Sequence, residues 1–167
     1  EQCMHDIGKE AVKKLMGSGG YIYKDDLNSF SPYPTENNAL EIYPDSELLV
    51  PMWSYMESPS ECSGGCTFTS MEKPLCKEGN DQCFTSGEGS VEEDLEKYME
   101  ENLGRCTNNF ERFRDKGYDI FSTSDPRFTV SIRDDSILFE LEKPLVIDYN
   151  LDKYELKEFS TSMESYL

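Results

Sequence analysis

Six cysteines are the residues of this chain best suited to chemistry, because thiols either bind metals or form disulfides. They are Cys3, Cys62, Cys66, Cys76, Cys83 and Cys106. Four of them lie close together in a stretch that contains Gly, Ser and Pro, which predicts a loop closed by disulfides. Several pairings are possible, and the most economical loops result if the four central cysteines pair among themselves and Cys3 pairs with Cys106.

Two alternatives to disulfides stay open. The spacing Cys62-x3-Cys66-x9-Cys76-x6-Cys83 could supply four thiolates to zinc, although it lacks the Cys-x2-Cys pairs that commonly place two ligands on one metal. The thiols could also stay reduced in a cytosolic protein. Disulfides persist in oxidising compartments, so the favoured interpretation predicts an extracellular or cell-surface protein.

Nucleophilic catalysis needs a base, and His5 is the one histidine in the sequence. Its position beside Cys3, near the start of the sequence, indicates an exposed or capping residue. The glycine-rich segment 17–20 follows a predicted helix and lacks the Lys and Ser or Thr of a phosphate-binding loop. We therefore expect no catalytic residues, no cofactor and no enzymatic activity.

Trp53 and Tyr55 form the candidate contact surface, because aromatic rings among acidic residues can stack on sugars. Paired carboxylates could also hydrolyse a glycoside without any histidine. A secreted polysaccharide-binding module or glycan hydrolase is therefore the alternative function. A role for Trp53 in core or loop packing is the simpler interpretation.

Calcium is the one metal for which the sequence offers candidate ligands. Glu78, Asn80 and Asp81 carry side-chain oxygens and lie between Cys76 and Cys83. Their spacing does not match the calcium-binding loop of EF-hands, and a solvated hairpin is favoured. We predict no metal site and keep these three residues as calcium candidates.

The charge of the chain limits its partners. It has 34 acidic and 16 basic residues, a formal net charge of -18, which repels phosphate backbones and anionic membranes. No apolar run approaches the roughly 18 residues that cross a bilayer. We expect neither nucleic acid nor a membrane span, and we expect self-association or other cell-surface proteins as partners, with glycans or divalent cations as further possibilities. Because the sequence starts at Glu1, we expect that an N-terminal segment has been removed or omitted.

Two amphipathic helices are predicted, over 1–17 and 90–116. In the first, apolar residues from Met4 to Met16 recur at steps of three and four. Ser90-Val91-Glu92-Glu93 is a capping box that opens the second. The apolar stripe of the second helix comprises Val91, Leu95, Tyr98, Met99, Leu103, Cys106, Phe110 and Phe113.

The rest of the chain divides into three segments. Prolines predict irregular structure with short strands over 18–60, including a strand at Tyr21–Tyr23, and an apolar segment over 48–56 that is buried or serves for docking. Residues 61–89 form the Cys-rich loop. Alternation of apolar residues predicts antiparallel strands over 117–162, with turns at Asp134-Asp135 and Lys143-Pro144 and a last strand near Tyr154.

The expected architecture is α+β: two helices packed on an antiparallel β-meander, with a disulfide-stapled irregular loop region. The whole chain, 1–167, is expected to form a single domain. The inward face of the meander needs a cover, and the long helix with its aromatic stripe could provide it.

Several patterns together resemble a family of uncharacterised archaeal surface proteins from small-genome lineages. They are Gly19-Gly20-Tyr21-Ile22, Val50-Pro51-Met52-Trp53-Ser54-Tyr55, and the run from Leu95 through Asn102-Leu103, Cys106 and Asn109-Phe110 to Phe113. The resemblance spans Cys3 to about Leu145 and implies an archaeal envelope setting, usually with an N-terminal membrane segment ahead of this region. We expect a noncatalytic extracellular structural or interaction protein, such as a subunit of a surface filament or envelope assembly.

Overall fold

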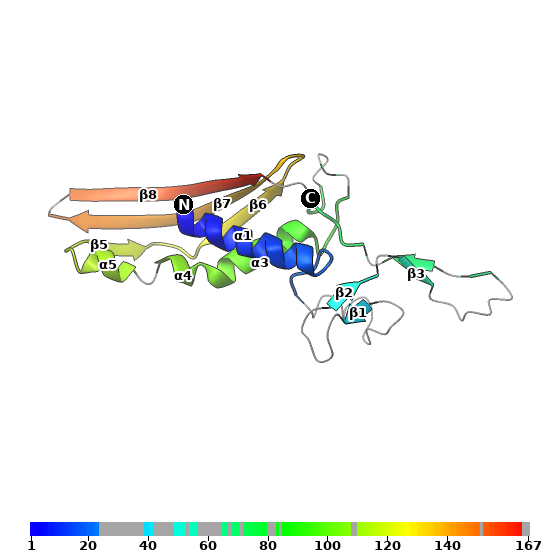
Figure 1. Ribbon diagram of the computed structural model, residues 1–167. Coiled ribbons are helices and arrows are strands. Elements are labelled where there is room, and N and C mark those ends of the chain that lie inside the picture. The colour runs from blue at the N-terminus through cyan, green and yellow to red at the C-terminus, as the bar shows by residue number, and fades with distance from the viewer. Residues whose placement is uncertain are drawn as a thin grey trace. The chain divides into compact units, whose positions relative to one another are not determined.

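The computed structural model is α+β, with helices and antiparallel sheets, as predicted (Figure 1). It describes residues 1–23, 39–41, 49–52, 54–56, 65–66, 68–70, 72–79, 83, 85–107, 110–150 and 152–164. The chain divides into two compact units, one of Glu1–Ala11 with Leu95–Leu167 and the other of Val12–Asp94. The boundaries between the units fall within helices α1 (Gln2–Gly17) and α3 (Val91–Asn102).

The first helix follows its sequence pattern. Met4, Ile7, Ala11 and Leu15 are all buried and lie at steps of three and four, which places them on one face. The backbone N–H of Gly20 donates to the carbonyl of Leu15 (2.9 Å), the kind of bond that closes a helix C-terminus. The helix predicted over 1–17 thus corresponds to α1.

The second helix starts as predicted, at a capping box. The N–H of Ser90 donates to Glu93 Oε2 (3.0 Å), and the N–H of Glu93 donates to Ser90 Oγ (3.3 Å). The prediction of one helix over 90–116 is wrong, because α3 ends at Asn102 and two single-turn helices follow, α4 (Gly104–Thr107) and α5 (Glu111–Arg114).

Backbone conformation explains the interruption. Gly104 has a low helix propensity, and Phe110 has φ 59°, a left-handed conformation that a right-handed helix cannot contain. The apolar stripe therefore does not continue as a buried face. Cys106 is only half-buried, and the side chain of Phe113 is 52% exposed.

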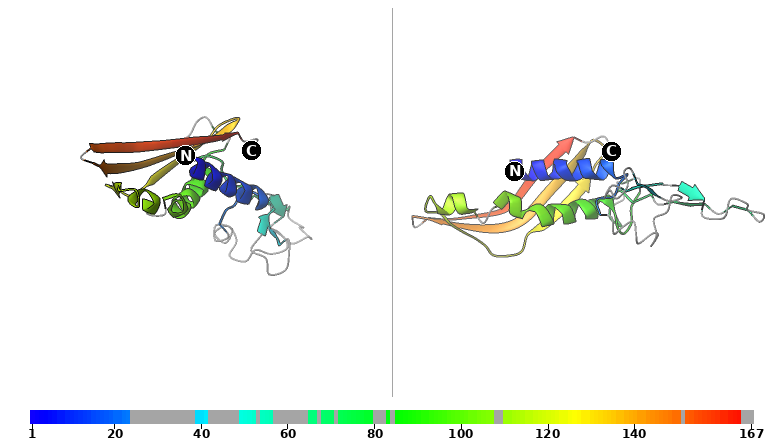
Figure 2. Two further views of the ribbon diagram at one scale, coloured as in Figure 1. Left: turned by 60° about the vertical axis from the view of Figure 1, so that its left-hand side comes forward. Right: turned by 60° about the horizontal axis from the view of Figure 1, so that its bottom comes forward.

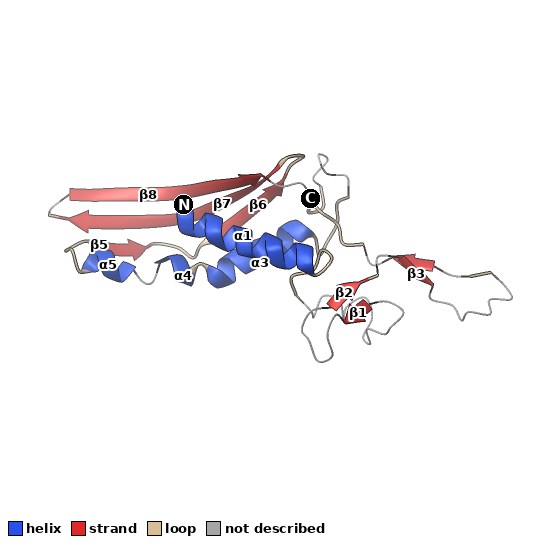
Figure 3. Ribbon diagram, viewed as in Figure 1, coloured by secondary structure: helices blue, strands red, loops and turns tan. Residues whose placement is uncertain are grey.

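One four-stranded antiparallel sheet dominates the C-terminal part of the chain (Figure 3). Its strands are β5 (Asp119–Ser122), β6 (Arg127–Ile132), β7 (Ser136–Tyr149) and β8 (Asp152–Glu164). Strand β7 pairs with β8 along its whole length on one side. On its other side it pairs with β6 through its first half and with β5 through its second half.

The strand predictions are partly confirmed. The hairpin around Asp134-Asp135 exists, and its innermost pair is Ile132 opposite Ile137. The turn predicted at Lys143-Pro144 is wrong, because β7 continues through both residues and the register with β8 shifts there instead. A β-bulge tolerates a proline that cannot donate a backbone hydrogen bond. Strand β5 lies within the span 117–162 predicted to form antiparallel strands, although no individual strand was predicted at its position.

Helices α1 and α3 pack on one face of this sheet, as predicted (Figures 1 and 2). Gly8 lies so close to the sheet that a Cβ atom there would come within 3.1 Å of the Phe139 ring. The two helices are joined by a hydrogen bond from Tyr98 to Glu10 (3.0 Å). The disulfide Cys3–Cys106, with a Cα–Cα distance of 5.5 Å, links α1 to α4.

The described residues of the other unit include two two-stranded antiparallel sheets. In one, β1 (Ala39–Glu41) pairs with β2 (Leu49–Pro51), and in the other, β3 (Ser54–Met56) pairs with β4 (Phe68–Ser70). The strand predicted at Tyr21–Tyr23 is wrong. Its central residue, Ile22, donates its N–H to Asp94 Oδ2 (3.3 Å) rather than to a neighbouring strand.

Within that unit, the segment around Cys76 is fixed to the start of α3. The N–H groups of Val91 and Glu92 donate to the carbonyls of Pro74 (2.8 Å) and Leu75 (3.1 Å). These bonds satisfy donors that would otherwise lack partners at a helix N-terminus. This part of the Cys-rich loop is therefore an ordered cap of the helix.

Candidate interaction surface

Of the predicted contact and calcium residues, the structure describes Tyr55 and Glu78. Trp53, Asn80 and Asp81 lie outside the described residues. Tyr55 belongs to β3, and Glu78 is exposed. Over the part of the chain that the structure describes, no three His, Cys, Asp or Glu side chains form a group that could hold a metal ion.

Two disulfides among the described cysteines agree with the pairing that loop economy favours. Cys3 is joined to Cys106 and Cys76 to Cys83. Cys66 is also disulfide-bonded, whereas Cys62 lies outside the described residues. Because Cys76 and Cys83 are joined to each other, neither has a thiolate to offer to zinc.

Polar side chains among the described residues hold elements together in both units. Glu10 accepts hydrogen bonds from Tyr98 Oη (3.0 Å) and Arg105 (2.9 Å). Burial, followed by the hydrogen bond and charge of Glu10, raises the pKa of Tyr98 above its usual value of 10.0. In the other unit, Lys73 and Asp94 form an ion pair with side chains only 3% and 7% exposed. Both clusters have a structural explanation.

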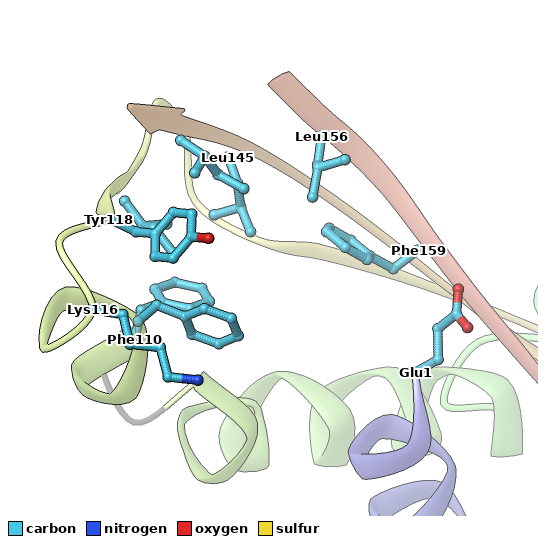
Figure 4. A pocket seen from close by; sticks show the side chains of 10 residues that line it. Glu1, Phe110, Lys116, Tyr118, Leu145, Leu156 and Phe159 are labelled. Atoms are coloured by element: carbon cyan, nitrogen blue, oxygen red, sulfur yellow. The ribbon is translucent and has the colours of Figure 1, made fainter. Parts of the chain in front are cut away.

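An apolar groove lies at the end of the sheet that α1 and α3 do not cover (Figure 4). Its volume is about 550 Å³. It is lined by Glu1, Phe110, Phe113, Lys116, Tyr118, Ile120, Leu145, Ile147, Leu156 and Phe159. In Figure 4, Phe110 and Tyr118 lie on one side of the groove, and Leu156 and Phe159 lie on the other.

Aromatic packing holds the α5 side of the groove in place. The rings of Tyr118 and Tyr149 stack with centroids 4.3 Å apart and an interplanar angle of 19°. Phe113 meets Tyr118 edge-on at 6.3 Å and 81°. Such pairs add roughly 0.5–1.5 kcal/mol beyond the area that they bury. The groove is therefore bounded by side chains that fix one another.

Strand β8 borders the groove and has an open edge. Within the described part of the chain, its backbone is hydrogen-bonded only to β7. Every residue from Asp152 to Glu158 is exposed, including Tyr154 at 56% and Leu156 at 45%. A long strand with unpaired main-chain groups and exposed apolar side chains can pair with another strand.

Neither the groove nor the open edge was predicted from the sequence. One signal was available. Tyr118 and Ile120 lie on either side of a polar residue directly after Gly117, and this alternation could have been recognised as the start of strand β5. The left-handed turn at Phe110, which ends the stripe and directs α5 to the groove, has no comparable signal.

Comparisons with protein-family models, curated proteins and solved structures gave no match. None of the helices in the described residues is both long and apolar enough to cross a membrane.

Proposed function

We propose that this protein is a noncatalytic surface protein that assembles with other copies or with other surface proteins. The observation that carries the proposal is the open edge of β8, a strand of 13 residues with hydrogen bonds to β7 alone among the described residues. Main-chain hydrogen bonds along such an edge supply affinity, and exposed side chains supply specificity. A subunit of a surface filament or envelope assembly is the sharper form of the proposal.

The apolar groove supports an interaction role. Leu156 belongs both to the open strand and to the lining of the groove, so a partner strand at this edge would also meet apolar side chains. Buried apolar area is the main source of favourable free energy in protein association. The surface therefore combines directional hydrogen bonds with a hydrophobic contact.

The disulfides support an extracellular or cell-surface location, because such bonds persist in oxidising compartments. The resemblance to archaeal surface proteins supports the same setting. A net charge of -18 favours solubility at high concentration. It also opposes nonspecific self-association, so any assembly must rely on a specific contact.

Sedimentation velocity over a range of protein, salt and Ca²⁺ concentrations tests the proposal. We expect the wild type to form larger species as its concentration rises. Leu156→Lys should reduce this association, because it places a charge at the open edge. Met16→Lys is the matched control on α1, where Met16 is 64% exposed, and should associate like the wild type. A wild type that stays monomeric under every condition would contradict the proposed function.

A further inference from the structure

We propose that the partner of β8 is β8 of a second copy, paired antiparallel about a two-fold axis at Leu156. This inference rests on the proposed function and names its partner. Identical subunits most often associate through a two-fold axis, which brings the same surface of each copy together. Two copies of one strand related in this way are antiparallel, and together their sheets would form one continuous sheet.

Symmetry restricts the possible registers. If the axis passes through one residue, that residue lies opposite its own copy, and residues at equal distances on either side of it lie opposite each other. Directly opposed residues have Cβ atoms roughly 4.5–5.5 Å apart, so unlike charges attract and like charges repel across the pair. The charged residues of β8 therefore select the register.

With the axis at Leu156, the charges are complementary. Glu155 of each copy lies opposite Lys157 of the other, which gives two equivalent ion pairs on either side of the central leucines. The overlap extends from Asp152 to Ser160, and no like charges face each other within it.

Other registers are less favourable. An axis at any charged residue places that charge opposite itself. At Glu155, the axis also places Lys153 opposite Lys157 and Asp152 opposite Glu158. An axis at Phe159 or beyond pairs no lysine with an acidic residue.

An axis at Tyr154 is the closest competitor. It pairs Lys153 with Glu155, but its overlap within β8 extends only from Asp152 to Leu156. The longer overlap at Leu156 gives more main-chain hydrogen bonds and opposes the two exposed leucine side chains. The register centred on Leu156 is therefore the one that the sequence of β8 favours.

Lysines on an edge strand often prevent pairing, so the arrangement of charges matters. Lys157 Nζ lies 3.6 Å from Glu155 Oε1 of the same strand, and both side chains are more than half exposed. A strand that alternates acid and base along one side is complementary to its own reversed copy when the two-fold axis lies midway between an acid and a base, as it does at Leu156. Strand β8 also contains no proline to block hydrogen bonding. Dimerisation exchanges one intrachain pair in each copy for two pairs between copies.

Cysteine cross-linking tests the register. Leu156→Cys should form a disulfide-linked dimer under mild oxidation with oxidised glutathione, because opposed Cα atoms are roughly 4.5–5.5 Å apart, within the range that disulfides span. Tyr154→Cys is the matched control. It is on the same strand and similarly exposed, but its copy would be about 13 Å away along the strand. Reductant-sensitive dimers identified by intact mass are the readout.

A charge-swap experiment tests the complementary pairs. Glu155→Lys and Lys157→Glu each place like charges opposite each other, so each variant alone should self-associate roughly tenfold more weakly. An equimolar mixture should recover association, because each lysine of the first variant then faces a glutamate of the second. With the axis at Tyr154, Lys157→Glu would retain wild-type association, which distinguishes the two registers.

The outcomes separate the inference from the proposed function. Dimers from Leu156→Cys but not Tyr154→Cys, with recovery in the mixture, support the inference. Dimers from Tyr154→Cys alone overturn the register. If the wild type associates but neither cysteine variant cross-links and the mixture does not recover, the inference fails and the proposed function stands. A strictly monomeric wild type overturns both.

Discussion

The β6 edge of the sheet is closed by a helix, whereas the β8 edge is open. Along β6, the N–H groups of Val130 and Phe128 donate to the carboxylates of Glu96 (2.8 Å) and Glu100 (3.4 Å) on α3. Along β8, the described residues make backbone hydrogen bonds only to β7. The same sheet thus has one edge protected from pairing and one available for it.

The closed edge depends on a match between two periodicities. Residues four apart on a helix are separated by roughly 6 Å along its axis, and residues two apart on a strand by roughly 6.6 Å. Glu96 and Glu100 therefore meet the outward N–H groups of Val130 and Phe128 in turn, with helix and strand running in opposite directions. An edge that lacks such a helix keeps its donors and acceptors available.

The largest expected effect concerns the part of the sheet that the helices cover. Phe139 is fully buried near Gly8 of α1, so Phe139→Ala should lower the free energy of unfolding by about 3–5 kcal/mol. Phe121→Ala makes the same chemical change where the ring is 41% exposed and should cost less than about 1 kcal/mol. Urea unfolding monitored by circular dichroism measures both. Equal losses would mean that the helices do not cover one part of the sheet more than the other.

A smaller effect is expected from opening the closed edge. Glu96→Ala removes the acceptor of the Val130 N–H, in a residue only 1% exposed, and should cost about 1–3 kcal/mol. Glu96→Gln keeps an oxygen acceptor and should lose less. Hydrogen exchange at the Val130 amide should accelerate in the alanine variant.

Glu158→Ala is the control for this prediction at the other edge. Glu158 is exposed on β8, and its replacement should change the free energy of unfolding by no more than about 0.5 kcal/mol. If Glu96→Ala and Glu158→Ala changed the free energy of unfolding by equally small amounts, the carboxylates of α3 would not be closing the β6 edge.

Local patterns predicted the features that depend on neighbouring residues. The capping box at Ser90, the hairpin at Asp134-Asp135 and the helix at 1–17 each need only a few residues that are close in sequence. The pairing of Cys3 with Cys106 also agrees with the simplest loop argument.

Features that depend on distant parts of the chain were missed. Periodicity alone extended the second helix through Gly104 and Phe110, because apolar residues there keep helical spacing even though they line a groove instead of the core. Lys143-Pro144 looked like a turn, but pairing with β8 keeps these residues within a bulged strand. Which edge of the sheet stays open depends on where α3 lies, and no local pattern in β8 contains that information.

The smallest effect is a pH dependence that originates at the covered part of the sheet. Because burial and Glu10 raise the pKa of Tyr98 above 10.0, the folded protein holds this proton more tightly than the unfolded chain. The contribution of this proton to the free energy of unfolding is complete below pH 10 and is lost as pH rises through the raised pKa.

Tyr98→Phe should lower stability at neutral pH, because it removes the hydrogen bond to Glu10, and should flatten the decline in stability between pH 9 and 11. Tyr154→Phe, on the open strand, retains Tyr98 and is the matched control. The measurement is the urea midpoint across this range, and parallel declines for Tyr98→Phe and the wild type would contradict the assignment.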